Sequence, residues 1–73
     1  MEQNVNEAAA IFEAGAVTLQ GATEEFGIGR SALYDEMNAG RLEFAQRGRR
    51  RLIPRKALQR ILAEDLVQPA NHA

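Results

Sequence analysis

The stretch GIGRSALYDEMNAGRL, residues 27–42, decides the fold of this chain. It opens with a glycine, which adopts a left-handed conformation without a Cβ penalty and can turn the chain sharply into a helix beginning near Gly29 or Arg30. Leu33 and Met37 stand four residues apart, so they share one face of this helix and point toward a neighbouring element. The opposite face carries side chains that can form hydrogen bonds: Ser31, Tyr34, Asp35 and Asn38, with Arg30 at its N-terminal edge.

The segment before this helix predicts a second helix that packs against it. Thr18 is a good N-cap, and the residues after it recur with the three-or-four spacing of one helical face. These inward-facing residues are Leu19, Ala22, Thr23 and Phe26. Gly27 ends this helix, as Gly40 ends the next one. Two short helices joined at a glycine are the helix-turn-helix pattern.

A further short helix is predicted near the N-terminus. Asn6 is a favourable N-cap, Glu7 suits the helix dipole, and three alanines follow before Gly15 ends the helix. Its apolar stripe comprises Ala8, Ile11, Phe12 and Gly15. This stripe must pack on its own domain, which we favour, or on another subunit.

The hydrophobic period after residue 40 changes from that of a helix to that of a strand. Residues 42–46 roughly alternate, and residues 50–53 follow after a turn that contains Gly48. We therefore expect a two-stranded β-hairpin, or wing, in this region. The imperfect alternation leaves open whether Leu52 or Ile53 faces the core.

A final helix is predicted from Pro54, because the first turn of a helix tolerates the missing N–H of proline. Its buried stripe is Leu58, Ile61 and Leu62, and its solvent-facing residues are Lys56, Gln59, Arg60 and Glu64. From Gln68 onward, proline, asparagine and small residues predict a flexible tail.

These elements predict a mainly α fold with a small β-hairpin, a winged helix-turn-helix with an extra N-terminal helix. The predicted organisation is an acidic N-terminal segment with the short helix (1–16), the winged helix-turn-helix domain (17–66) and the tail (67–73). A chain of 73 residues is close to the size at which one core supplies only about 3–5 kcal/mol. Help from a partner chain or from a ligand is therefore expected.

The positive charges are concentrated in one part of the chain, although the net charge is −1. All nine lie between Arg30 and Arg60, whereas residues 1–27 contain five acidic residues and no base. Four of them crowd the predicted turn: Arg47, Arg49, Arg50 and Arg51. Charges more than about 8–10 Å away are largely screened, so this local face can bind phosphates despite the net charge. A basic hairpin after a helix-turn-helix predicts a module that binds double-stranded DNA.

The composition argues against several other classes of function. The chain has no cysteine, and its single histidine, His72, falls in the predicted tail, so we expect no metal site and no cofactor. Ser31 and Tyr34 could suggest a recombinase nucleophile. Such chemistry needs activating groups and a pocket that this short chain scarcely provides, so we expect no enzyme activity. We find no apolar run long enough to span a membrane and no basic, apolar leader at the N-terminus. We therefore expect a cytoplasmic, nucleoid-associated protein.

Six blocks of residues occur in a characteristic order and spacing. They are VTL (17–19), FGI (26–28), RSALY (30–34), GRL (40–42), GRR (48–50) and IPRKAL (53–58). Together they resemble the small winged helix-turn-helix proteins of the excisionase type, which are related to the DNA-binding domain of MerR-like regulators. The resemblance covers about two-thirds of the chain.

The resemblance implies that the helix of residues 30–39 enters the DNA major groove and that the wing reaches the neighbouring minor groove or phosphates. The candidate contacts of the helix are Arg30, Ser31, Tyr34 and Asn38, and those of the wing are Arg47, Arg49, Arg50 and Arg51. Candidate contacts to the DNA backbone are Thr18, Arg41, Arg55 and Lys56. An alternative role for Tyr34 is that of a core aromatic with its hydroxyl at the surface.

The chain departs from the family pattern at three places. Gly29 replaces a capping serine or threonine, which weakens the start of the helix by a few tenths of a kcal/mol. The acids Asp35 and Glu36 replace residues that are commonly basic or neutral, and Asp35 would repel phosphate unless it accepts from a cytosine amino group. Arg51 stands where an aromatic is frequent, which we expect to add charge but remove packing.

The function that the resemblance implies is that of an accessory DNA-binding protein, a recombination directionality factor. Such a protein binds cooperatively, bends DNA and biases an integrase toward excision. A stand-alone transcriptional regulator fits the residues nearly as well. A protein-interaction module that has lost DNA binding, and that uses Asp35, Glu36 and the face with Phe12, is a third alternative. The acidic N-terminal third could dock on the basic wing of a neighbouring copy, so we expect self-association on DNA.

Overall fold

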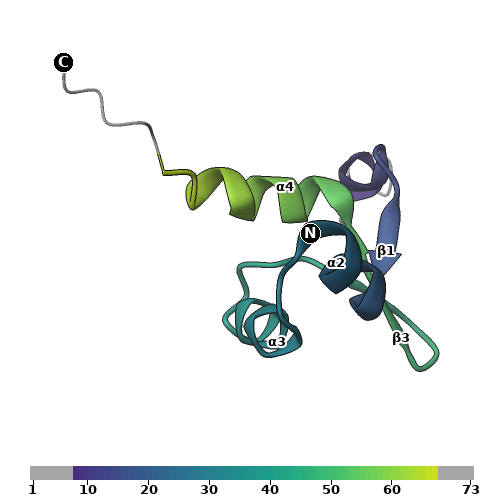
Figure 1. The fold of residues 1–73 in the computed structure, drawn as a ribbon. Helices are drawn as coiled ribbons and strands as arrows, with labels where there is room; N and C mark the ends of the chain where they lie inside the picture. Colours follow the sequence, from purple (N-terminus) through teal and green to yellow (C-terminus); the bar gives the residue numbers. More distant parts are fainter. Residues whose placement is uncertain (1–7, 68–73) are drawn as a thin grey trace, which may run out of the picture.

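The computed structural model describes residues 8–67. Their elements are the 3-10 turn η1 (Ala10–Phe12), strand β1 (Ala16–Thr18), helices α2 (Leu19–Phe26) and α3 (Arg30–Asn38), strands β2 (Ala45–Arg47) and β3 (Arg50–Pro54), and helix α4 (Arg55–Glu64) (Figure 1). The strands form an antiparallel sheet in the order β1-β3-β2. This architecture confirms the predicted mainly helical fold with a β-hairpin, a winged helix-turn-helix.

The helix-turn-helix forms at the predicted residues. The Thr18 hydroxyl accepts a hydrogen bond from the Gly21 N–H at 3.1 Å, which caps the start of α2. Gly27 has a φ of +71° and donates its N–H to the Thr23 carbonyl at 2.9 Å, so it ends α2 in the left-handed conformation. Leu33 is 1% exposed and faces inward from α3 as predicted.

The predicted hairpin exists, although its first strand begins later than residue 42. Its loop is Gly48-Arg49, with Gly48 at a φ of +62°. The first strand begins at Ala45, because Leu42 belongs to the turn after α3. The Leu42 N–H donates to the Glu36 carbonyl at 3.2 Å, and the residue is buried in the core. The sequence did not predict β1, whose Val17 pairs with Ile53, and three residues are too few for an alternating pattern to be visible.

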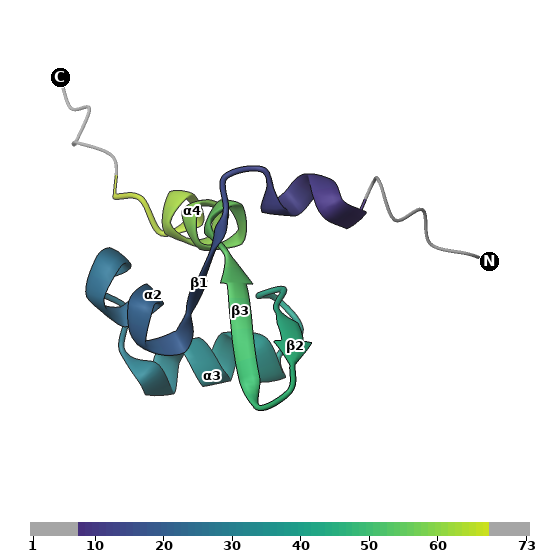
Figure 2. The same ribbon diagram turned by 90° about the vertical axis from the view of Figure 1, so that its right-hand side faces the viewer.

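The core lies between the helices and one face of the sheet (Figure 2). It comprises Val17, Ala22, Leu33, Met37, Leu42, Ile53, Ala57, Leu58 and Ile61. Ile53 is fully buried whereas Leu52 is half-buried, which answers the question that the alternation left open. The assignment of Leu62 to the buried stripe of the last helix was wrong. Leu62 is 40% exposed, and α4 buries Ala57 in addition to Leu58 and Ile61.

Pro54 lies one position earlier than predicted relative to the last helix. It ends β3 and serves as the N-cap of α4, with an extended backbone at φ −63° and ψ 134°. The Arg55 N–H that follows donates to the Gly15 carbonyl at 2.9 Å. Proline suits this position because it needs no N–H partner and disfavours a helical conformation in the residue before it.

The segment before β1 packs on its own chain. It includes the 3-10 turn η1, and Gly15 ends it with a φ of +87°. Ile11 packs against the core, and η1 lies beside α4. The predicted N-cap Asn6 and the predicted tail from Gln68 onward lie outside the described residues. Within residues 8–67, the helices are too short and too polar to cross a membrane.

Candidate nucleic-acid interface

An open groove of about 560 Å³ lies between α3, the β2–β3 hairpin and the start of α2. Its lining residues are Thr18, Leu19, Gln20, Arg30, Tyr34, Gln46, Arg49, Arg50 and Arg51. Figures 1 and 2 both place α3 and the hairpin at one end of the molecule and α4 at the other. The second helix of the helix-turn-helix and the wing therefore share one concave surface.

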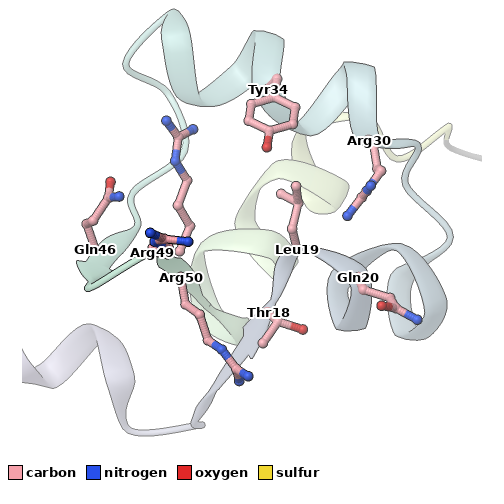
Figure 3. Close-up of a pocket in the computed structure, with 9 residues that line it drawn as sticks. Thr18, Leu19, Gln20, Arg30, Tyr34, Gln46, Arg49 and Arg50 are labelled. Carbon is pink, nitrogen blue, oxygen red and sulfur yellow. The ribbon is translucent and has the colours of Figure 1, made fainter.

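Two of the four predicted contacts on α3 line this groove. Arg30 and Tyr34 reach from α3 toward the space between the helices and the wing (Figure 3). Tyr34 is 41% exposed, which is more than a core aromatic shows. Ser31 and Asn38 are exposed on α3 but do not line the groove.

The wing contributes three of its four predicted arginines to the groove. Arg49 belongs to the hairpin loop, whereas Arg50 and Arg51 begin β3. Arg47 is exposed on β2, where it pairs with Arg50 in the sheet register, but it does not line the groove. These arginines stand close together on one short hairpin, so each raises the local positive potential that its neighbours feel.

Arg51 differs from the other wing arginines because it packs against aromatic rings. Its guanidinium carbon lies 5.2 Å from the centre of the Tyr34 ring and 4.7 Å from that of the Phe44 ring. Its Nη1 lies 3.9 Å from the sulfur of Met37. The expectation that arginine removes packing at this position was wrong, because the guanidinium plane takes the place of an aromatic ring.

The three basic side chains predicted to contact the DNA backbone form ion pairs within the chain. Arg41 binds Glu36 through two hydrogen bonds of 2.9 and 2.8 Å. The Arg55 Nε lies 2.9 Å from Glu25, and the Lys56 Nζ lies 2.8 Å from Glu13. Arg60 is paired in the same way with Glu43.

These ion pairs divide the positive charges into two groups. Four of the nine basic residues have a carboxylate partner, and the other five have none within residues 8–67. The five are Arg30, Arg47, Arg49, Arg50 and Arg51. All five belong to the start of α3 or to the hairpin, so the uncompensated positive charge gathers around the groove.

The ion pairs that join α4 to other parts of the chain also shift the pKa values of five of their members. The hydrogen bond from Lys56 holds the pKa of Glu13 below its usual value of 4.5, and the hydrogen bond from Arg55 does the same for Glu25. The pKa of Glu43 is lowered mainly by the hydrogen bond from Arg60. The pKa values of Arg55 and Arg60 are raised by their glutamate partners. The carboxylates of Glu13, Glu25 and Glu43 therefore remain charged at neutral pH.

The groove contains three residues that the sequence did not indicate. Leu19 and Gln20 form the first turn of α2, and Gln46 lies opposite Arg51 in the hairpin. The amide of Gln20 donates to Glu24 at 2.9 Å. Neighbouring Thr18, a predicted backbone contact, also lines the groove, while its hydroxyl caps α2. A signal for Gln20 was its place in the first turn after a predicted N-cap, Thr18, because this turn of α2 faces the wing.

Comparison with known families identifies the fold of this surface. A family model described as a helix-turn-helix domain matches residues 17–65, which include α2, α3, the hairpin and α4. No curated protein and no solved structure shows a significant match to the chain. The matched residues make up more than half of the chain and contain every residue that lines the groove. The chain therefore belongs to the excisionase-type helix-turn-helix family of DNA-binding domains.

Proposed function

We propose that the groove between α3 and the wing is the DNA-binding surface, with α3 in the major groove and the wing on the adjacent minor groove or phosphates. The major groove of B-DNA is about 12 Å wide and admits one α-helix. Arg30 and Tyr34 then face base edges or phosphates from α3, and Arg49 and Arg50 reach the backbone or minor groove from the wing. Ser31, Asn38 and Arg47 are exposed next to this surface.

The observation that carries this proposal is the distribution of the uncompensated charges. The far end of β3, Pro54, lies about 13 Å along the strand from Arg50. Arg55 and Lys56 follow this end at the start of α4, and both are neutralised by glutamates. The arginines around the groove have no such partner within residues 8–67. Binding of DNA phosphates is therefore most favourable at the groove, where they neutralise arginines that repel one another.

The proposed role on DNA is that of an accessory protein of the excisionase kind. Several copies bind neighbouring sites, bend the duplex and bias an integrase toward excision. Its action is binding alone, with no chemical step, in keeping with the typically non-enzymatic character of this family. The same role places the protein in the cytoplasm, on the nucleoid.

Self-association of these copies uses the acidic N-terminal part against the basic wing of the neighbour. Glu13 and Glu25 are engaged in ion pairs with their own α4, so they contribute little to this contact. Glu24 is exposed and has no basic partner within residues 8–67. The substitution Glu24→Lys is expected to reduce the cooperativity of binding to a duplex with repeated sites and to spare binding to a single site.

The central experiment measures affinity for a mixed-sequence 20-base-pair duplex at several salt concentrations. If five phosphates are neutralised, the slope of log K against log salt is about −4 to −5. The double variant Arg49→Ala/Arg50→Ala is expected to lower affinity for every sequence and to make this slope less negative by about 1.8. Lys56→Ala removes one charge at the far end of β3 and serves as the control. An unchanged slope in the double variant would contradict the proposed surface.

A bending assay separates the excisionase role from the alternative role of a transcriptional regulator. Fluorescence transfer between the ends of a duplex with repeated sites is expected to rise as copies bind. A straight duplex at saturation, together with regulation of a nearby promoter, would favour the regulator. Absence of salt-sensitive binding to random duplex, expected at about 10⁻⁴ to 10⁻⁶ M, would favour the protein-interaction module.

A further inference from the structure

Arg51 connects the wing to α3 by stacking. Its guanidinium lies within 5.2 Å of the Tyr34 ring centre, and Tyr34 belongs to α3. The second ring, that of Phe44, lies 4.7 Å away and precedes β2 directly. The sulfur of Met37, also on α3, is 3.9 Å from Nη1. One side chain of β3 thus contacts two residues of α3 and one residue at the base of the hairpin.

These contacts distinguish Arg51 from the arginines beside it. Arg51 is half-buried, whereas Arg49 and Arg50 are exposed. A planar guanidinium that packs on aromatic faces is held in one orientation. Its Nη1 is directed at the Met37 sulfur, so fewer of its N–H groups are open to a phosphate than those of Arg49 and Arg50. Arg49 and Arg50 have no such partner in the described part of the chain, so their guanidinium groups are open to a ligand.

We infer that Arg51 is a positioning residue, which holds the wing at a set angle to α3, and that it does not itself contact a phosphate. This inference rests on the proposed function, because the angle matters only if α3 and the wing bind one duplex together. Arg49 and Arg50 then provide the phosphate contacts, and Arg51 keeps them at the distance from α3 that the duplex requires.

Substitution of Arg51 by lysine or by methionine distinguishes a positioning role from a direct contact with a phosphate. Lysine keeps the positive charge but lacks the plane that stacks between two rings. Methionine loses the charge but keeps a long apolar chain whose sulfur packs favourably against aromatic rings. A positioning residue is therefore sensitive to lysine and tolerant of methionine, whereas a phosphate contact has the opposite sensitivity.

The experiment compares Arg51→Lys and Arg51→Met with Arg49→Lys and Arg49→Met on a mixed-sequence 20-base-pair duplex. Arg51→Lys is expected to weaken binding about 3- to 10-fold with an unchanged salt slope, because it disturbs the wing but keeps the charge. Arg51→Met is expected to keep the slope. Arg49→Met is expected to make the slope less negative by about 0.9, and Arg49→Lys to bind like the unchanged protein.

Two results would overturn the inference while leaving the proposed function intact. One is a loss of about 0.9 in the slope for Arg51→Met together with unchanged binding of Arg51→Lys. The other is unchanged binding of both Arg51 variants while Arg49→Met loses slope. An unchanged slope in Arg49→Met would instead count against the proposed function.

A measurement on the free, unchanged protein tests the stacking without relying on any variant. Ring currents from Tyr34 and Phe44 are expected to move the δ-proton resonances of Arg51 upfield of those of Arg49. Equal shifts for the two arginines would overturn the inference even if an Arg51 variant failed to fold. Tyr34 is the only tyrosine in a chain without tryptophan, so its fluorescence reports directly on its contact with Arg51 in each variant.

Discussion

Individual residues of the groove combine a structural role with the binding role that we propose for them. Thr18 lines the groove and at the same time caps α2 through its hydroxyl. Tyr34 packs against Arg51 through its ring, while the residue as a whole remains 41% exposed. The ring of Tyr34 therefore serves the fold, and the hydroxyl remains available to a ligand.

The substitution Tyr34→Phe separates these two roles. It keeps the ring beside Arg51 and removes only the hydroxyl, so the thermal midpoint is expected to stay unchanged. DNA affinity is expected to fall by about 1 kcal/mol, the net value of one hydrogen bond. Gel-shift titration of the two proteins on one duplex measures this difference. Equal affinity would show that Tyr34 acts through packing alone.

At the scale of the elements, the turn between α2 and α3 sets the direction of α3. Gly27 has a φ of +71°, and a Cβ built on it would meet no atom within 4 Å. A larger residue there is therefore opposed by backbone strain and not by a clash. The start of α3 adds little local stability of its own, because Gly29 is its N-cap and provides no side-chain hydrogen bond.

The substitution Gly27→Ala tests how much this turn contributes. We expect the free energy of unfolding to fall by about 1 kcal/mol, because alanine is strained in the left-handed region. Gly27→Asn is expected to cost less, since asparagine tolerates this conformation. Urea denaturation of the three proteins measures the order. Equal losses for alanine and asparagine would contradict an explanation by backbone strain.

At the scale of the whole molecule, ion pairs fasten the N-terminal part and α4 to the remainder. Lys56 pairs with Glu13, Arg55 with Glu25, and Arg60 with Glu43, and each pair joins residues far apart in the sequence. Exposed pairs of this kind individually contribute little to stability. Their larger effect is on the electrostatic potential of the protein, because they neutralise the side of the molecule away from the groove.

These pairs make stability fall at acid pH. The pKa values of Glu13, Glu25 and Glu43 in the folded protein lie below the usual 4.5. Below pH 4.5 the unfolded chain therefore binds more protons than the folded one, and the contribution of the pairs is lost as the pH falls through the folded values. We expect the thermal midpoint to be lower at about pH 3 than at pH 7.

The variants for this measurement replace glutamate by glutamine, either at the three paired residues or at one residue without a basic partner in residues 8–67. The triple variant Glu13→Gln/Glu25→Gln/Glu43→Gln is expected to show a weaker dependence of its thermal midpoint on pH. Glu24→Gln, at a residue without a basic partner in residues 8–67, is expected to behave like the unchanged protein. A triple variant as sensitive to acid as the unchanged protein would contradict this role of the pairs.

The sequence alone predicted α2, α3, the hairpin and most of α4, because their signals are local. A capping threonine, glycines at positive φ and residues spaced three or four apart act within one or two turns. The helix predicted to begin near Gly29 or Arg30 and the actual α3 therefore begin within one residue of each other. Leu62 was misassigned because a helical stripe does not show where the covering elements end.

Only the tertiary structure decided which of the predicted site residues line the groove and which form ion pairs. Strand β1 pairs with β3 from more than thirty positions away, and the ion pairs that neutralise Arg55 and Lys56 join residues 30 and 43 positions apart. Neither contact leaves a periodic trace in the sequence. The stacking of Arg51 likewise depends on two rings that the fold brings to it. Local propensity determined the elements, and packing between distant segments determined which arginines have no carboxylate partner in the described part of the chain.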